Sequence, residues 1–207
     1  MLEPVTEVHT LSAAPGAAHG LPDLLLIERA RAQDARALET LTRRYAQRLY
    51  RIARSVLGEE PAAEAAVQEV CVAAFAQLRR HEPAGKFAIW LTRLALEHAR
   101  ARRDGPHSMA RAPAAPRHPL EPAIDALPEV FRTVFVLRVL EGMSGPEAAL
   151  TVGVHETTVR TRLYRAHRRL GVPAAATDGR AGIFGLDGLR TERIVATVLA
   201  RLQTETA

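Results

Sequence analysis

Apolar residues recur at spacings of three and four along most of the chain, which is the period of a helix buried on one face. The clearest example follows Asp34, a candidate helix N-cap, and runs to Gly58, a candidate helix stop. Its apolar stripe consists of Leu38, Leu41, Tyr45, Leu49, Ile52 and Val56. No run alternates strongly between apolar and polar residues with hairpin turns at its ends, so the sequence predicts an all-α fold.

The predicted helices fall into two small domains. The first, residues 22–103, holds four helices that begin near Pro22, Asp34, Pro61 and Lys86. Residues 104–122 contain five prolines, which predicts an extended linker. The second domain, residues 123–171, contains AIDALPEVFRTVFVLRVLEG, SGPEAALTV and a basic helix. Residues 1–21 predict a flexible tail, and residues 172–207 predict a C-terminal extension that ends in an amphipathic helix.

The end of the second domain has the pattern of a helix-turn-helix. Ser144 and Glu147 have capping-box spacing, a short helix follows, and Gly153 allows a tight turn. The next helix carries an apolar stripe and, on its other side, five arginines. The stripe is Val159, Leu163, Ala166 and Leu170, and the arginines are Arg160, Arg162, Arg165, Arg168 and Arg169.

Nucleic acid, an anionic membrane and plain solvent are the candidate partners of this arginine face. The membrane is disfavoured because Tyr164 is the only aromatic residue of the helix and no large apolar residue lies on the outward face. The preceding turn favours DNA, since the second helix of such a motif enters the major groove. The net charge of +5 and the pI of about 10.3 also favour a polyanionic partner.

Cysteine and histidine content exclude several classes of protein. Cys71 is the only cysteine and lies in an apolar run, so we expect a core residue, no disulfide and no thiolate metal site. His155 and His167 lack metal-ligand spacing and read as surface residues. With no nucleophile motif and no phosphate-binding glycine loop either, we expect no enzyme and no cofactor. The absence of a signal-peptide pattern and of a long apolar run predicts a cytoplasmic protein.

Several stretches resemble a known family. MSGPEAALTVGVHETTVRTRLYRAHRRL resembles, without gaps, the region 4 helix-turn-helix of bacterial sigma factors of the extracytoplasmic-function (ECF) kind, and ALPEVFRTVFVLRVLEGMS is similar to the helix before it. LTRRYAQRLYRIARSVLG, AEAAVQEVCVAAF and GKFAIWLTRLA resemble region 2, in the family's order and spacing. The resemblance covers residues 23–103 and 123–170.

The resemblance implies a subunit that directs core RNA polymerase to specific promoters. In that family, region 2 binds the polymerase clamp helices and opens the −10 element, while region 4 binds the β flap and reads the −35 element. Core polymerase and promoter DNA are therefore the expected partners, with an anti-sigma factor as a further candidate. Gln68 and Glu69 match the family's VQE motif and are expected to face the clamp helices, although an ordinary exposed polar pair is the alternative.

Base contacts at the −35 element are expected from the first turns of the basic helix. The candidates are Glu156, Thr157, Thr158, Arg160 and Thr161, with Arg162, Arg165 and Arg168 at phosphates; Arg169 is equally well explained as solvated. The candidates at the −10 element are Phe87 and Trp90, as stacking platforms for unpaired bases, and Arg93, Arg100, Arg102 and Arg103, at phosphates. Trp90 stands between Ile89 and Leu91, so a place in the core is the favoured alternative for it.

The chain departs from the family pattern at three places. Ala62, Glu64 and Ala65 replace an acidic motif, and residues 155–159 differ from the family's turn. Glu97 and Ala101 stand where asparagine and aspartate are usual, and a carboxylate there would repel phosphate. A sigma-like protein that opens promoters poorly is therefore one alternative. A stand-alone helix-turn-helix regulator is another, although it leaves the region 2 domain without a role.

The last helix is an addition to the two regions. Its apolar stripe is Ile194, Val195, Val198, Leu199 and Leu202, so it should pack on another surface. One interpretation is a brace on region 4. The other, our hypothesis from the sequence, is that the helix docks across both regions and regulates polymerase binding.

Overall fold

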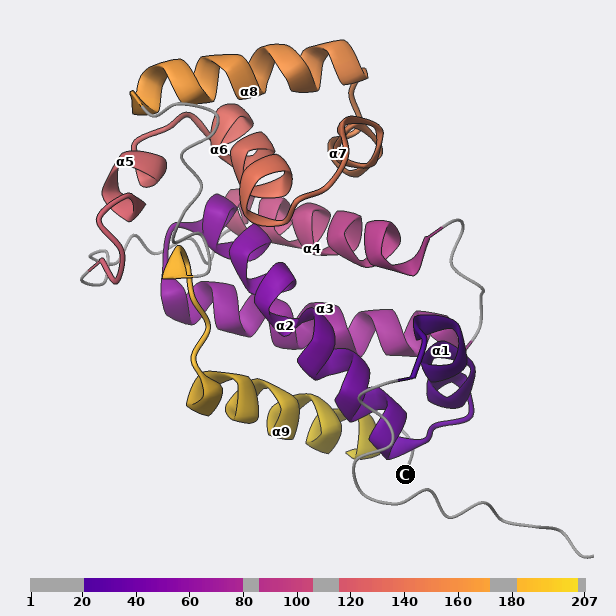
Figure 1. The fold of residues 1–207 in the computed structure, drawn as a ribbon. Coiled ribbons are helices and arrows are strands. Elements are labelled where there is room, and N and C mark those ends of the chain that lie inside the picture. Colours follow the sequence, from indigo (N-terminus) through magenta and orange to yellow (C-terminus); the bar gives the residue numbers. More distant parts are fainter. Residues whose placement is uncertain (1–20, 80–85, 106–115, 172–181, 205–207) are drawn as a thin grey trace, which may run out of the picture.

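The computed structural model describes residues 21–79, 86–105, 116–171 and 182–204, and every regular element among them is helical (Figure 1). The all-α prediction is confirmed. The predicted tail and the start of the C-terminal extension lie outside the described residues. The helices are α1 (Asp23–Arg31), α2 (Ala35–Leu57), α3 (Glu60–Leu78), α4 (Phe87–Asp104), α5 (Glu121–Asp125), α6 (Glu129–Phe135), the π-helical turn η1 (Val136–Leu140), α7 (Gly145–Val152), α8 (Glu156–Leu170) and α9 (Gly188–Thr204).

Helix α2 is the centre of the first domain and packs against α1, α3 and α4. Asp34 caps it by accepting hydrogen bonds from the backbone N–H groups of Arg36 and Ala37, and Gly58 ends it in the left-handed conformation, as the sequence predicts. Small residues such as Ala63 and Ala95 are fully buried between the helices. Because these side chains are short, the helices approach closely without many aromatic residues.

The second domain contains α5 to α8, with α6 and α7 beneath α8. The sequence predicts one helical stretch from residue 123, but the structure divides it. The chain leaves α5 before Pro128, because the residue before a proline is pushed out of the helical conformation, and α6 then begins at Glu129. The π-helical turn η1 is a further feature that the apolar spacing did not reveal.

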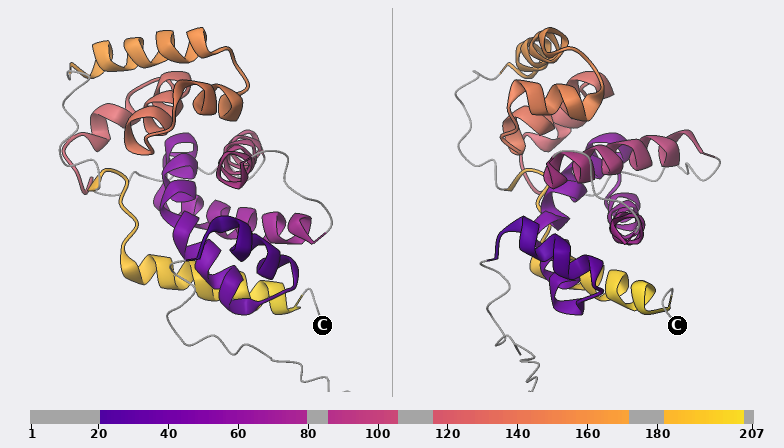
Figure 2. Two further views of the ribbon diagram at one scale, coloured as in Figure 1. Left: turned by 45° about the vertical axis from the view of Figure 1, so that its right-hand side comes forward. Right: turned by 90° about the vertical axis from the view of Figure 1, so that its right-hand side faces the viewer.

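The two domains pack against each other, with α2 and α4 facing α6, η1 and α7 (Figures 1 and 2). Residues 106–115 of the predicted linker lie outside the described part of the chain. At its ends, α4 continues to Asp104 and α5 already begins at Glu121. The interface carries several ion pairs, described below, that join residues far apart in the sequence.

Helix α9 packs on α2 and α3, and its side chains Ile194, Val198 and Leu202 are buried there. The views in Figures 1 and 2 place α9 and α8 at opposite ends of the molecule. A brace on region 4 is therefore the wrong interpretation of this helix. It belongs to the first domain, and residues 182–187, which precede it, lie between the two domains.

Candidate nucleic-acid interface

The turn between α7 and α8 is built from local interactions. The Ser144 hydroxyl accepts a hydrogen bond from the Glu147 N–H, and the Glu147 carboxylate accepts one from the Ser144 N–H at 3.0 Å. Gly153 then adopts a φ of +70°, which favours glycine, and α8 starts three residues later. The predicted helix-turn-helix is present, with α8 as the second helix.

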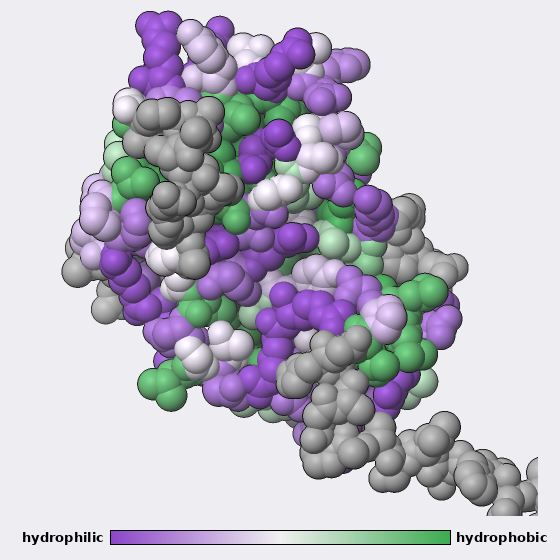
Figure 3. Space-filling view, viewed as in Figure 1, coloured by the Kyte–Doolittle hydropathy of each residue, from purple (hydrophilic) through white to green (hydrophobic). Residues whose placement is uncertain are grey.

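Helix α8 presents its apolar stripe to its own domain and its arginines to the outside. Val159 and Ala166 are 1% and 0% exposed, while Leu163 and Leu170 are half-buried. The hydrophilic side chains over α8 form the upper edge of the molecule in Figure 3. None of the five arginines of α8 forms an ion pair with a carboxylate in the described part of the chain. Their charge is thus available to a phosphate backbone.

The −35 candidates differ in accessibility. Thr158 and Arg162 are half-buried, and the Thr161 hydroxyl donates a hydrogen bond to the Thr157 carbonyl at 2.9 Å. The exposed candidates are Glu156, Thr157, Arg160, Thr161, Arg165 and Arg168. The geometry thus favours an interface along the exposed side of α8, with Thr158 and Arg162 at its margin.

A hollow at the end of α8 was not predicted from the sequence. Phe131 of α6 lines it together with Arg165, Arg168 and Arg169. The Arg169 guanidinium lies 5.5 Å from the centre of the Phe131 ring, a cation–π contact. Arg169 is therefore held against the protein rather than simply solvated. The sequence around Phe131 does not indicate that it lines a hollow, because Phe131 has the spacing of any apolar residue on a helix.

The position of Phe87 contradicts its prediction as a stacking platform. Phe87 is only 6% exposed, and its ring lies 5.4 Å from that of Tyr45 in an edge-to-face contact and 5.6 Å from that of Trp90. A ring enclosed in this way cannot stack on a base unless the core opens. Trp90 is half-buried at the edge of the same cluster and keeps an accessible side, so it remains the aromatic candidate.

Each of the four α4 arginines proposed for the −10 element has a carboxylate partner. Arg100 Nε donates to Glu129 Oε1 at 2.9 Å, and Arg103 pairs with the other oxygen of the same carboxylate. Glu129 belongs to α6, so the second domain neutralises two of the −10 candidates. This pairing could not be predicted from the sequence, because Glu129 has the position of an ordinary acidic residue at the start of a helix.

The two remaining α4 arginines pair within the first domain. Arg93 Nε lies 2.7 Å from Glu97 Oε1, one helical turn away, and both side chains are exposed. The Glu97 charge, which was expected to repel phosphate, thus has a cation beside it. Arg102 Nη1 lies 2.9 Å from Glu69 Oε1.

Gln68 and Glu69 are both half-buried on α3. Glu69 is hydrogen-bonded to His98 at 2.7 Å as well as to Arg102. Burial alone would raise the pKa of Glu69, but these partners hold it below its usual value. The carboxylate is therefore charged, and it holds the C-terminal half of α4 against α3. Gln68 makes no comparable contact among the described residues.

Within the described residues, no cluster of His, Cys, Asp or Glu has the arrangement of a metal site. Cys71 is 1% exposed, and burial raises the pKa of its thiol to about 12. None of the described helices has the length and apolar content to cross a membrane.

Comparisons with known proteins agree with this arrangement of two domains. The family model for sigma-70 region 2 matches residues 41–104, and that for sigma-70 region 4 matches residues 117–170. The chain is 31% identical over 153 residues to the ECF RNA polymerase sigma factor SigE of Mycolicibacterium smegmatis, covering 64% of this chain and 59% of SigE. It therefore spans less than two thirds of the length of that relative.

Two further relatives are matched over nearly their whole length. The RNA polymerase sigma-H factor of Pseudomonas aeruginosa is 26% identical over 176 residues, covering 72% of this chain and 91% of that protein. The solved structure of CnrH in complex with the cytosolic domain of CnrY superposes with a TM-score of 0.58 at 30% identity, covering 72% of this chain and 94% of CnrH. Because both sigma-70 regions are matched in order and an ECF sigma factor is among the relatives, the chain belongs to the sigma-70 family as an ECF-type sigma factor.

Proposed function

We propose that this protein is a promoter-specificity subunit that binds core RNA polymerase and directs it to promoters with distinct −10 and −35 elements. It acts in the cytoplasm by binding rather than by catalysis, because the chemistry of transcription belongs to the polymerase. The observation that carries the proposal is the exposed arginine face of α8, set on a helix-turn-helix and joined in one chain to a complete region 2 domain.

The −35 element is the proposed target of α8. Arg160, which is exposed near the helix start, is proposed to bond the O6 and N7 atoms of guanine, and Glu156 is proposed to accept from the N4 amine of cytosine. Arg165 and Arg168, further along the helix, are proposed to contact phosphates. The −10 element is the proposed target of α4, through Trp90 and the arginines at the end of that helix.

Core polymerase is the proposed protein partner of both domains, with Gln68 and Glu69 of α3 at the clamp helices and the second domain at the β flap. CnrH, a relative, was solved in complex with the cytosolic domain of another protein. By analogy we include an anti-sigma factor among the proposed partners.

Run-off transcription tests the proposal directly. Core polymerase is supplied with a pool of genomic promoter fragments from the host, with and without the protein. New transcripts that share two spaced sequence elements are expected only when the protein is present. The variant Arg160→Ala should reduce them, whereas Arg201→Ala, an exposed arginine of α9, serves as the matched control.

Two results would contradict the proposal. Sequence-specific DNA binding without any affinity for core polymerase would instead indicate a stand-alone regulator. Tight binding to core polymerase without transcripts from any fragment would indicate a sigma-like protein that does not open promoters.

A further inference from the structure

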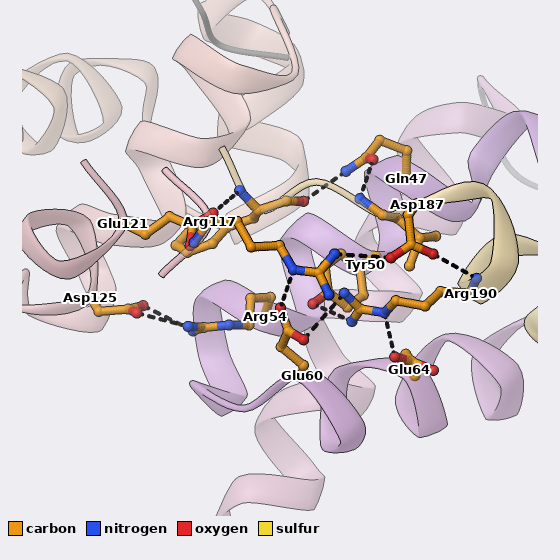
Figure 4. Close-up of polar contacts among 12 residues, drawn as sticks. Gln47, Tyr50, Arg54, Glu60, Glu64, Arg117, Glu121, Asp125, Asp187 and Arg190 are labelled. Atoms are coloured by element: carbon orange, nitrogen blue, oxygen red, sulfur yellow. Dashed lines mark hydrogen bonds and ion pairs between the residues drawn. The ribbon is translucent and has the colours of Figure 1, made fainter. Parts of the chain in front are cut away.

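Residues 182–187, here called the strap, lie between the two domains and contact both. Ile183 and Phe184 of the strap are each 3% exposed. Gln47 of α2 binds the strap through both ends of its amide, donating to the Phe184 carbonyl at 2.9 Å and accepting from the Leu186 N–H at 2.8 Å (Figure 4). The Gln47 amide thereby satisfies one carbonyl and one N–H group of the strap backbone, as a peptide group of an adjacent chain segment would.

Two arginines of α2 hold the strap and the second domain at the same time. Arg51 donates from Nε to the Ile183 carbonyl at 3.0 Å and from Nη1 to Glu141 Oε1, also at 3.0 Å. Arg54 pairs with Asp125 while its guanidinium lies 4.8 Å from the centre of the Phe184 ring. Because each guanidinium is oriented by the strap, loss of the strap also weakens the hold on the second domain.

The second domain contacts the strap from the other side. Glu121 of α5 accepts from the Phe184 N–H at 2.8 Å with one carboxylate oxygen and from the Arg117 N–H at 2.9 Å with the other. Arg117 reaches Asp187 at the end of the strap, with Nη1 3.0 Å from Oδ2 (Figure 4). The strap therefore bridges the start of the region 4 domain and α2.

Helix α9 anchors the strap to the first domain. The Arg190 side chain is 7% exposed and lies among Glu64, Glu60 and Tyr50, with its Nη2 2.6 Å from the Tyr50 hydroxyl and its Nη1 3.3 Å from the Glu60 carboxylate. A buried charge with this many partners is expensive to release. The strap itself is held by two neutral hydrogen bonds with Gln47, by contacts with charged side chains of both domains, and by the Phe184 ring.

The packed arrangement is incompatible with simultaneous reading of both promoter elements. Positions −10 and −35 are about 25 base pairs apart, which at 3.4 Å per base pair is about 85 Å of duplex. A compact chain of about 200 residues has a radius of gyration of roughly 17 Å, hence a diameter of roughly 45 Å. In addition, Glu129 of the second domain occupies Arg100 and Arg103 of the proposed −10 surface. The two domains must separate before both elements can be engaged.

We propose that the strap is an intramolecular latch, which holds region 4 against region 2 and must release it before the protein engages a promoter. The role in transcription rests on the proposed function, whereas the closure itself does not. The variant Gln47→Ala tests it cleanly, because among the described residues the side-chain hydrogen bonds of Gln47 all go to the strap. Gln203→Ala, an exposed glutamine of α9, is the matched control, and Phe184→Ala is a second, independent variant.

Opening is measured as a distance between spin labels on the full-length chain. Cysteines replace Glu28 on α1 and Tyr164 on α8, both exposed, while buried Cys71 is protected from the label. The unmodified latch should give one narrow distance distribution. Gln47→Ala and Phe184→Ala should each raise the ratio of open to closed molecules roughly 5- to 30-fold, the effect of losing one or two net hydrogen bonds or an equivalent contact. Thermal unfolding confirms that the variants remain folded.

The outcomes separate the latch from the proposed function. If both variants keep the distance distribution of the Gln203→Ala control, the latch is excluded, whatever the protein does in transcription. If they open the molecule and also raise promoter-directed transcription above that of the parent protein, the latch and its role are supported. If they open the molecule and neither they nor the parent direct transcription, the latch stands and the proposed function fails.

Discussion

Arg54 of α2 forms a two-pronged ion pair with Asp125 of α5, with Nη1–Oδ1 and Nη2–Oδ2 distances of 2.9 and 2.8 Å. The Arg54 side chain is 6% exposed and that of Asp125 is 28% exposed. The pair joins the two sigma-70 regions across a distance of 71 residues in the sequence. A parallel pair of charge-assisted hydrogen bonds fixes orientation as well as contact, so this pair sets how the domains face each other.

Replacing the acidic partner should therefore destabilise the packed molecule. Asp125→Asn leaves a nearly buried guanidinium without a counter-charge, and we expect a loss of about 2 kcal/mol in the free energy of unfolding, since one partner is partly solvated. Denaturant unfolding followed by circular dichroism measures it. Glu192→Gln, which removes an exposed carboxylate of α9, is the control and should change stability by less than about 0.5 kcal/mol. Equal stabilities for the two variants would show that the pair contributes nothing net.

Local signals and long-range contacts differ in how well the sequence predicts them. Ser144, Glu147 and Gly153 specify the turn before α8 through hydrogen bonds and a φ angle that involve only near neighbours, so the helix-turn-helix could be predicted. Partners of Arg100 and Arg54 come from another domain, and no spacing rule connects them. The packing site of α9 depends on whether α2 and α3 form a surface complementary to its apolar stripe. The sequence of α9 by itself does not contain that information.

Phe87 shows the same limit at a single residue. Its place in a family motif suggested contact with DNA, but whether a ring on α4 points outward depends on what fills the space beside it. Tyr45 of α2 provides that neighbour, and the ring turns inward. Trp90, three residues further along α4, is half-buried at the edge of this cluster, so it packs partly against the core and still keeps an accessible side.

The capping box of α7 should make stability depend on acid pH. Hydrogen bonds from Ser144, and then from Lys86, lower the pKa of Glu147 to about 2 from its usual value near 4.5. Because the folded-state pKa is depressed, the stabilising contribution is fully present above about pH 4.5 and is lost as the pH falls towards 2. Glu147→Gln keeps an acceptor but no titrating charge, so it should be less stable than the parent by about 0.5–1 kcal/mol at pH 6.

The measurement is the difference in unfolding free energy between the parent and Glu147→Gln from pH 6 down to pH 2. The difference should shrink towards zero across the acid range. A difference that stays constant with pH would mean that the Glu147 charge does not stabilise α7.

Release of the α4 arginines should increase the affinity of the free protein for single-stranded DNA. Burial alone would raise the pKa of Glu129, but hydrogen bonds from Arg103 and Arg100 lower it, so this carboxylate is charged and competes with phosphate. In Glu129→Gln, Arg100 loses its carboxylate partner, whereas Arg103 keeps Asp104 beside it. The slope of log K against log salt should become steeper by about 0.7, since Arg100 can then neutralise one phosphate and each phosphate neutralised on a single strand contributes about 0.7.

Fluorescence anisotropy with a labelled single-stranded oligonucleotide, at several salt concentrations, provides that slope. Glu192→Gln changes the net charge equally but removes a partner of Arg43 on α2, which keeps its ion pair with Glu39, so its slope should change less. If the slope of log K against log salt becomes steeper by the same amount in both variants, the effect comes from net charge and not from the α4 surface.

Two arginines of α8 should have different effects on promoter binding by the polymerase complex. Arg160 lies in the second turn of the helix and is proposed to contact a base, so Arg160→Ala should cost about 1–3 kcal/mol on the preferred promoter and relax the preference at one base pair. Arg168 lies near the other end and is proposed to contact phosphate. Arg168→Ala should weaken all duplex sequences equally and lower the salt slope by about 0.9.

A panel of promoters with single substitutions across the −35 element separates these effects, because only a base contact makes the loss depend on sequence. The reverse result, a sequence-dependent loss for Arg168→Ala and a uniform loss for Arg160→Ala, would mean that α8 enters the groove by its C-terminal end. The hollow lined by Phe131 and Arg169 would then lie at the bases rather than at the backbone. Either result fixes the direction of α8 on the promoter, since both residues lie on one rigid helix and cannot exchange roles without turning the whole domain.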